Sequence, residues 1–173
     1  MIESRLNVLL LADTHLGEGQ AVRLVDKLSG HLATCDVIIH AGDITDASVL
    51  TALEEFAPVR AVLGNNDRGM LLPERLVVEL AGCQVAVVHD SGAAGGRTAR
   101  LRRWFPHADV VVFGHSHIPW HEIDIRASDG HVQHHVNPGS VMQRRTAPHH
   151  TIAVLQLRDA VVVDVTHIVI SGV

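Results

Sequence analysis

The sequence is poor in aromatic residues and cysteine, and it has no long apolar run. Three Phe, two Trp and no Tyr among 173 residues leave little surface on which nucleic-acid bases could stack. Cys35 and Cys83 form no CxxC pair, so we expect buried, reduced thiols rather than a disulfide. No apolar run is long enough to cross a membrane. These absences argue against nucleic acid and membranes as partners.

Charge and chain length narrow the class of protein further. The formal net charge of −5 excludes a bulk basic field that would attract nucleic acid. The first apolar run is broken by Asp13 and His15 and lacks the features of a signal peptide. With 47% hydrophobic and 19% charged residues, the composition is that of a globular protein. We therefore expect a single domain spanning residues 1–173, with a sizeable core and a cytoplasmic location.

The first third of the chain alternates apolar runs with amphipathic segments. Apolar residues at i, i+3, i+4, i+7 and i+11 from Ala21 to Leu32 predict a helix with one buried face. A second helix is expected after Thr45 or Asp46 as N-cap, and Pro58 opens the third apolar run. This order of strand and helix favours a parallel sheet with crossover helices.

The rest of the chain predicts mostly strands. One short helix is expected at about 98–105, and Asp129-Gly130 is a strong hairpin signal. Two sheets packed face to face, with helices outside, would use all of these segments, giving an α/β (α+β) fold. The strands expected in this part of the chain are 76–80, 85–88, 110–113, 118–126, 131–136, 152–157 and 161–170.

Short polar motifs follow five of the predicted strands. Open α/β sheets bind ligands at the carboxyl ends of their strands, so these motifs should meet in one place. Carboxylates, amide oxygens and imidazoles together suit a pair of divalent metal ions. Residues two apart on a strand point to the same side, which we expect for Asp13 with His15 and for His115 with His117. The motifs are Asp13-Thr14-His15, Gly42-Asp43, Gly64-Asn65-Asn66-Asp67, His89 and Gly114-His115-Ser116-His117.

In this order, the motifs resemble those of the calcineurin-type metallophosphoesterase superfamily. The short chain, the GNND variant and Asn137-Pro138-Gly139-Ser140 resemble its small bacterial and archaeal phosphodiesterase branch. The resemblance implies a four-layer α-β-β-α sandwich of two mixed sheets flanked by helices. It also implies two divalent metal ions, for which manganese suits the oxygen and imidazole ligands and iron, zinc or nickel are alternatives. One ion would be held by Asp13, His15 and His117 and the other by Asn65, His89 and His115, with Asp43 bridging them.

This resemblance predicts a phosphodiesterase that uses a metal-bridging hydroxide for in-line attack on a small-molecule phosphate ester. Many family members carry His where this chain has Asn66, and Asn66 cannot act as an acid near neutral pH. We therefore expect a preference for aryl or nucleoside leaving groups, which need little protonation. The expected catalytic residues are Asp43, Asn66 and Asp67, and for Asp67 orientation of Asn65 or helix capping is favoured over direct catalysis.

Several residues keep two interpretations. Arg68 either meets the phosphate or is solvated, and His40 either packs in the core or supports the site. The turn at 137–140 either orients a ligand or only closes the chain. The arginines at 97, 100, 102 and 103 either form a solvated helix face or contact substrate. The histidines expected to lie on the surface, away from the metals, are His31, His107, His131, His134, His135, His149 and His150.

Alternative functions are a phosphomonoesterase, a nucleotide pyrophosphatase or a non-catalytic, retromer-type protein-binding scaffold. Relatives of that scaffold lose metal-binding histidines, whereas every expected ligand position here carries a competent residue. The apolar C-terminal strands could form the edge of a homodimer.

Overall fold

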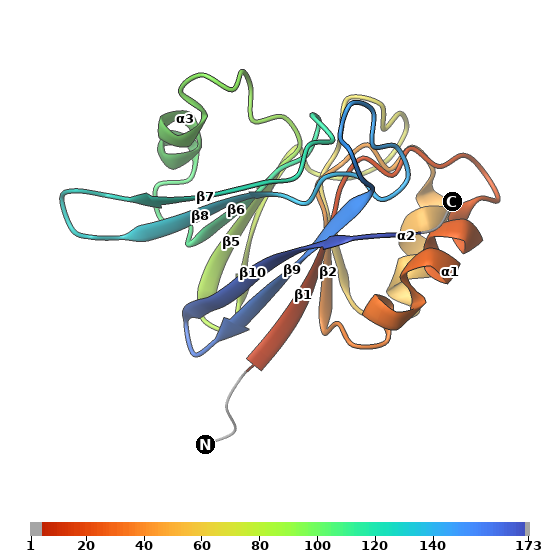
Figure 1. Ribbon diagram of the computed structural model, residues 1–173, viewed down its shortest axis with the longest axis horizontal. Helices are drawn as coiled ribbons and strands as arrows, with labels where there is room; N and C mark the ends of the chain where they lie inside the picture. The colour runs from red at the N-terminus through yellow and green to blue at the C-terminus, as the bar shows by residue number, and fades with distance from the viewer. Residues whose placement is uncertain (1–4, 172–173) are drawn as a thin grey trace.

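The computed structural model describes residues 5–171 and folds them into two five-stranded sheets (Figure 1). The first sheet has the order β10-β9-β1-β2-β3 and the second the order β4-β5-β6-β8-β7. The strands of the first sheet are β1 (Arg5–Leu11), β2 (Val37–His40), β3 (Val59–Ala61), β9 (Thr151–Arg158) and β10 (Val161–Val169). Those of the second are β4 (Arg75–Leu80), β5 (Cys83–Val88), β6 (Val110–Val112), β7 (Trp120–Ile125) and β8 (Val132–Asn137).

The described helices lie outside the pair of sheets. Helices α1 (Ala21–Leu32) and α2 (Ala47–Glu54) pack beside the first sheet, and α3 (Arg97–Trp104) lies on the side of the second (Figure 1). Between the sheets, valine, leucine and isoleucine side chains from both form a fully buried core. The expected α-β-β-α sandwich is confirmed.

Local sequence signals explain the helix positions. The buried residues of α1 are Ala21, Leu24, Leu28 and Leu32, which fall on one face at the spacing read from the sequence. Helix α2 begins after Asp46, whose carboxylate accepts a hydrogen bond from the Ser48 amide at 2.9 Å.

Parallel pairing brings the motif-bearing strand ends to one edge. Strands β1, β2 and β3 run parallel, with Leu11 opposite His40 and His40 opposite Ala61. Strands β5, β6 and β8 are also parallel, with Val112 opposite both Val87 and Val136. The loops that follow these strands therefore leave both sheets on the same side of the molecule.

Two expectations from composition can be compared with the described residues. Cys35 and Cys83 are free thiols; Cys83 is buried as expected, whereas Cys35 is only partly buried. Within residues 5–171 we find no helix with the length and apolarity needed to cross a membrane.

Candidate metal centre

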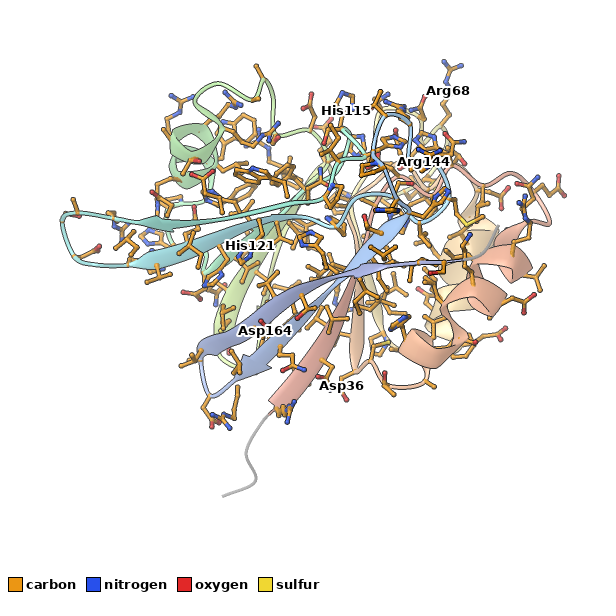
Figure 2. The ribbon with its side chains drawn as sticks, in the orientation of Figure 1. Asp36, Arg68, His115, His121, Arg144 and Asp164 are labelled. Carbon is orange, nitrogen blue, oxygen red and sulfur yellow. The ribbon has the colours of Figure 1, made fainter. Side chains whose placement is uncertain are left out.

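The loops after the parallel strands bring together all seven residues expected to bind metal. Two overlapping groups have ligand atoms that all lie within 4.8 Å of one another, namely Asp13 with His15 and His117, and Asp13 with Asp43 and His89. His115 lies at the upper rim of the molecule, on the same side as Arg68 and Arg144 (Figure 2).

The first half contains Asp13, His15 and His117. Nε2 of His117 lies 3.4 Å from Oδ1 of Asp13 and 3.3 Å from Nε2 of His15. Asp13 and His117 are fully buried. Two imidazole nitrogens and a carboxylate oxygen thus face a common point, as the ligands of one divalent ion would.

The second half contains Asn65, His89 and His115. The amide oxygen of Asn65 lies 3.1 Å from Nε2 of His89 and 3.0 Å from Nδ1 of His115. Asn65 follows β3, His89 follows β5 and His115 follows β6, so loops from both sheets supply the ligands of this half. An amide oxygen between two imidazoles adds no negative charge to this half.

Asp43 lies between the two halves. Its Oδ2 is 3.3 Å from Nε2 of His15, and its Oδ1 is 3.5 Å from Nε2 of His89. Each carboxylate oxygen therefore faces a histidine of a different half. This is the arrangement that a carboxylate bridging two ions requires.

The ring orientation of two histidines is set by backbone carbonyls. His89 donates from Nδ1 to the carbonyl of Ala41 at 2.7 Å, and His117 donates from Nδ1 to the carbonyl of Gln143. A carbonyl can only accept, so both rings carry the proton on Nδ1. The lone pair on Nε2 then points toward the centre, which is the usual way in which proteins orient a metal-binding histidine.

The electrostatics of the buried ligands favour binding of a cation. Burial, together with the nearby Asp43 carboxylate and against the opposing effect of His89, raises the pKa of Asp13 to about 7. Burial lowers the pKa of His117 to about 4, which keeps its ring neutral and able to bind a cation. Oδ2 of Asp13 is buried and has no hydrogen-bond partner in the described protein. A divalent cation would satisfy this oxygen, so the residues present fit a metal centre.

Asp43 and His89 lie next to each other in the centre, with Oδ1 of Asp43 3.5 Å from Nε2 of His89. Burial opposes ionisation of Asp43, but hydrogen bonds from His89 and Asn66 hold the pKa of the carboxyl well below its usual range. Burial also opposes protonation of His89, while its contacts with Asp43 and the Ala41 carbonyl raise the pKa of the ring. The His89 ring thus lies against the Asp43 carboxylate, where a cation bound to its Nε2 would also lie.

The backbone at the ligands differs from the expectation of paired residues on one strand face. That expectation is wrong for Asp13 with His15 and for His115 with His117, because β1 and β6 end before these residues. Their φ angles are 54°, 46°, 68° and 61° in chain order, in the left-handed region. The side chains converge because the loops turn, not because a strand alternates. Asp43 shares this conformation, with φ 56°.

Asp67 and Asn66 hold the loops and the Asp43 carboxylate in place. Oδ2 of Asp67 accepts hydrogen bonds from the amides of Asp43 at 2.9 Å and Gly64 at 2.7 Å, and its Oδ1 accepts from Thr45 at 2.7 Å. Asn66 donates to Asp43 from its side chain at 2.7 Å and from its backbone at 2.9 Å. Asp67 therefore positions the two ligand-bearing loops, and Asn66 positions the carboxylate between the two halves.

Gly64 permits the close approach of these loops. A Cβ at this position would lie 2.1 Å from the amide nitrogen of Asp43 and 2.2 Å from its Oδ1. Any side chain would push the Asp43 loop away from the Asn65 loop. The glycine of the GNND motif is therefore needed for packing around the centre.

The turn at 137–140 supports the ligand loops. Ser140 donates to the carbonyl of Asp13 at 2.7 Å, and Asn137 donates to the carbonyl of Gly114 at 3.0 Å. His40 is fully buried, with its Nε2 3.1 Å from the Thr14 hydroxyl. The turn and His40 thus contact the loops that carry the ligands, and neither contributes a ligand side chain.

Three of the four arginines in α3 make specific contacts with the protein. The interpretation of a solvated helix face is therefore wrong for these three. Arg102 bonds to Asp124 at 2.7 Å, and Arg100 donates to the carbonyl of Ser91 at 2.6 Å. The Arg97 guanidinium lies 5.2 Å from the ring centroids of both Phe113 and Trp120. These contacts tie α3 to the β7–β8 hairpin and to the loop that precedes the helix.

Two features of the site were missed from the sequence. The charge of Arg145 contributes to lowering the pKa of His117 and of His15, although burial is the largest cause for both. Arg75 lines a cavity together with Asn65 and His89. Neither arginine belongs to a motif, so spacing alone gave no signal.

Comparisons with known proteins agree with this class of fold and site. Residues 6–160 match the calcineurin-like phosphoesterase superfamily domain. A probable metallophosphoesterase of Methanothermobacter thermautotrophicus is 33% identical over 144 residues, covering 80% of each chain. The crystal structure of a predicted phosphoesterase from Streptococcus pneumoniae has a TM-score of 0.70 at 23% identity, covering 95% of this chain and 90% of that one.

A protein named for vacuolar sorting shares the same fold. Vacuolar Protein Sorting 29 from Cryptosporidium parvum has a TM-score of 0.69 at 16% identity, covering 95% of this chain and 98% of that one. At that identity the likeness concerns the fold alone.

The two-sheet fold with an aspartate and histidine centre at its loop edge defines a metallophosphoesterase. The chain belongs to the calcineurin-like phosphoesterase superfamily. Membership supports a hydrolase that acts on phosphoester bonds and uses divalent metal ions.

Proposed function

We propose that this protein is a phosphodiesterase with a dinuclear metal centre. The observation that carries the proposal is the position of Asp43, whose two oxygens face His15 and His89 of different halves at 3.3 and 3.5 Å. A carboxylate shared in this way suits two ions a few ångströms apart, on the order of 3.5–4 Å in such sites.

The donor set assigns a role to each residue. Asp13, His15 and His117 would hold one ion, and Asn65, His89 and His115 the other. Oxygen and imidazole donors without thiolate are compatible with Mn²⁺. When bound, two such ions supply positive charge for the phosphoryl oxygens and lower the pKa of the attacking water.

Asn66 shapes the choice of leaving group. Its side-chain amide and its backbone amide both donate to Asp43, at 2.7 and 2.9 Å, and an amide cannot give up a proton near neutral pH. Among the motif residues, none is then free to protonate a departing alkoxide. General acid help is worth about 10²–10⁴-fold where present, so alkyl esters should react slowly and aryl esters faster.

The test is hydrolysis of bis-p-nitrophenyl phosphate compared with p-nitrophenyl phosphate. The protein is stripped of metal and reloaded with Mn²⁺, beside Asp43→Asn and the matched control Asp46→Asn. Asp46 carries an exposed helix cap that Asn can also make. We expect metal to restore diester cleavage in the wild type and in Asp46→Asn but not in Asp43→Asn.

Other outcomes would redirect the proposal. Faster cleavage of the monoester would favour a phosphomonoesterase. If neither ester is cut with any divalent metal, the catalytic proposal is wrong, and the protein-binding scaffold becomes the better hypothesis.

A further inference from the structure

A cavity of about 380 Å³ opens beside the second half of the metal centre. Its lining includes three proposed ligands, Asn65, His89 and His115, and three charged residues, Glu74, Arg75 and Asp90. A phosphate ester held at the centre would therefore extend one substituent into this cavity. The residues beyond the ligands then decide which substituents are accepted.

Arg75 is the fixed cation of this cavity. It is the first residue of β4 and lies opposite Val88, the residue before His89, so its backbone is anchored next to a proposed ligand. Its guanidinium lies 4.3 Å from the centroid of the Trp104 ring and 5.8 Å from that of Phe105. This cation–π contact restrains the Arg75 side chain without using the N–H donors of its guanidinium.

No carboxylate among residues 5–171 forms an ion pair with Arg75. By contrast, Arg102 and Arg126 each bond an aspartate, at 2.7 and 2.6 Å. A planar guanidinium with an open edge matches the geometry of a phosphate, which it binds with two parallel hydrogen bonds.

We propose that Arg75 binds a second phosphate group of the substrate, so that the site selects phosphodiesters that carry an additional phosphate. This inference rests on the proposed function, because the first phosphate must lie at the metal centre. Arg75 would act as a specificity-determining residue in the cavity lining.

The negative charges of Glu74 and Asp90 weaken the binding of a second phosphate but do not abolish it. Asp90 accepts a hydrogen bond from the Gly92 amide at 2.7 Å, so one of its oxygens is already engaged in the loop. Glu74 is exposed and precedes Arg75. Neutralising Glu74 should therefore strengthen binding of the second phosphate, and Glu74→Gln is a matched neighbour of Arg75→Gln.

The first experiment measures binding alone, by titration calorimetry of the Mn²⁺-loaded protein. Thymidine 3′,5′-bisphosphate is compared with thymidine 5′-monophosphate. Charge-assisted hydrogen bonds of this kind predict roughly tenfold tighter binding of the bisphosphate by the wild type. In Arg75→Gln the ratio of the two Kd values should fall below about 2, and in Glu74→Gln it should stay or rise.

The second experiment measures the ratio of kcat/KM for the p-nitrophenyl esters of the same two nucleotides. If neither ester is cleaved but the Kd ratio depends on Arg75, the proposed function fails and the phosphate site stands. Equal Kd values for the two nucleotides, or an unchanged ratio in Arg75→Gln, would overturn the Arg75 site even if both esters are cleaved. Preferential cleavage of p-nitrophenyl phosphorylcholine, lost in Glu74→Gln, would show that the cavity takes a cation instead.

Discussion

Replacing Asp67 by Asn distinguishes support of the metal centre from participation in the reaction. The Asp67 carboxylate is 9% exposed and accepts three backbone hydrogen bonds, from Asp43, Gly64 and Thr45 at 2.7 to 2.9 Å. These amides belong to the two loops that carry Asp43 and Asn65. An asparagine fits the same space but offers one oxygen and an NH₂ group.

The cost follows from the changed hydrogen bonds. If the asparagine oxygen stays on the amides of Asp43 and Gly64, its NH₂ group faces the Thr45 amide, donor against donor. One charge-assisted bond is lost and two become neutral. At about 1.5–3 kcal/mol for a hydrogen bond to a charged group, the free energy of unfolding should fall by roughly 2–4 kcal/mol. For a chain of this size, that lowers Tm by roughly 5–12 °C.

The assay is thermal unfolding of the metal-free and Mn²⁺-loaded forms, together with kcat for bis-p-nitrophenyl phosphate at saturating metal. Asp46→Asn serves as the control, because its carboxylate caps an exposed helix end and Asn caps almost as well. We expect a large loss of Tm, weaker metal binding and a modest loss of kcat in Asp67→Asn. A wild-type Tm with a loss of kcat of a hundredfold or more would refute this reasoning and place Asp67 in the chemistry.

Three further predictions concern single residues. Asn66→His should raise the rate on alkyl diesters relative to aryl diesters by tenfold or more, because an imidazole can protonate the alkoxide; an unchanged ratio in steady-state assays would argue against it. His135 is fully buried, and burial lowers its pKa to about 4, so stability should fall as pH drops from about 6.5 toward 4, where only the unfolded chain takes up the proton. In His135→Gln the decrease in Tm between pH 7 and pH 5 should be smaller, as scanning calorimetry can check. His115 has φ 68°, a conformation that glycine adopts more easily than alanine. The free energy of unfolding of metal-free His115→Gly should therefore exceed that of His115→Ala by about 1 kcal/mol, measured by thermal unfolding. Equal values would show that this backbone is not strained.

The fold could be predicted because its signals are local. The buried face of α1 and the Asp46 cap of α2 were read from residues a few positions apart, and the structure agrees. Parallel pairing then follows from the alternation of strands and helices. The meeting of the motifs at one edge is a consequence of that pairing, so it too could be predicted.

The interactions that could not be predicted are long-range or depend on backbone angles. Arg102 reaches Asp124 across 22 positions, and no periodicity in α3 reveals such a partner. His135 was expected on the surface, and this is wrong, because β8 carries it beneath α3, where its Nε2 bonds Gln133 at 2.8 Å. The turning of the chain at Asp13 likewise has no signature in residue spacing.

The backbone of the centre shows why aspartate and histidine recur there. Five of the seven proposed ligands have positive φ, namely Asp13, His15, Asp43, His115 and His117. Asp and His enter the left-handed region more readily than most residues, so the residue types that bind metal also tolerate these turns. Backbone bonds hold the loops, with Asp13 donating to Gly42 at 2.9 Å and His15 to Asp43 at 3.0 Å. Backbone hydrogen bonds within the fold thus support the strained conformation of these residues. The same residues therefore serve two purposes, because they form the turns of the loops and also present the oxygen and nitrogen atoms that a metal centre needs.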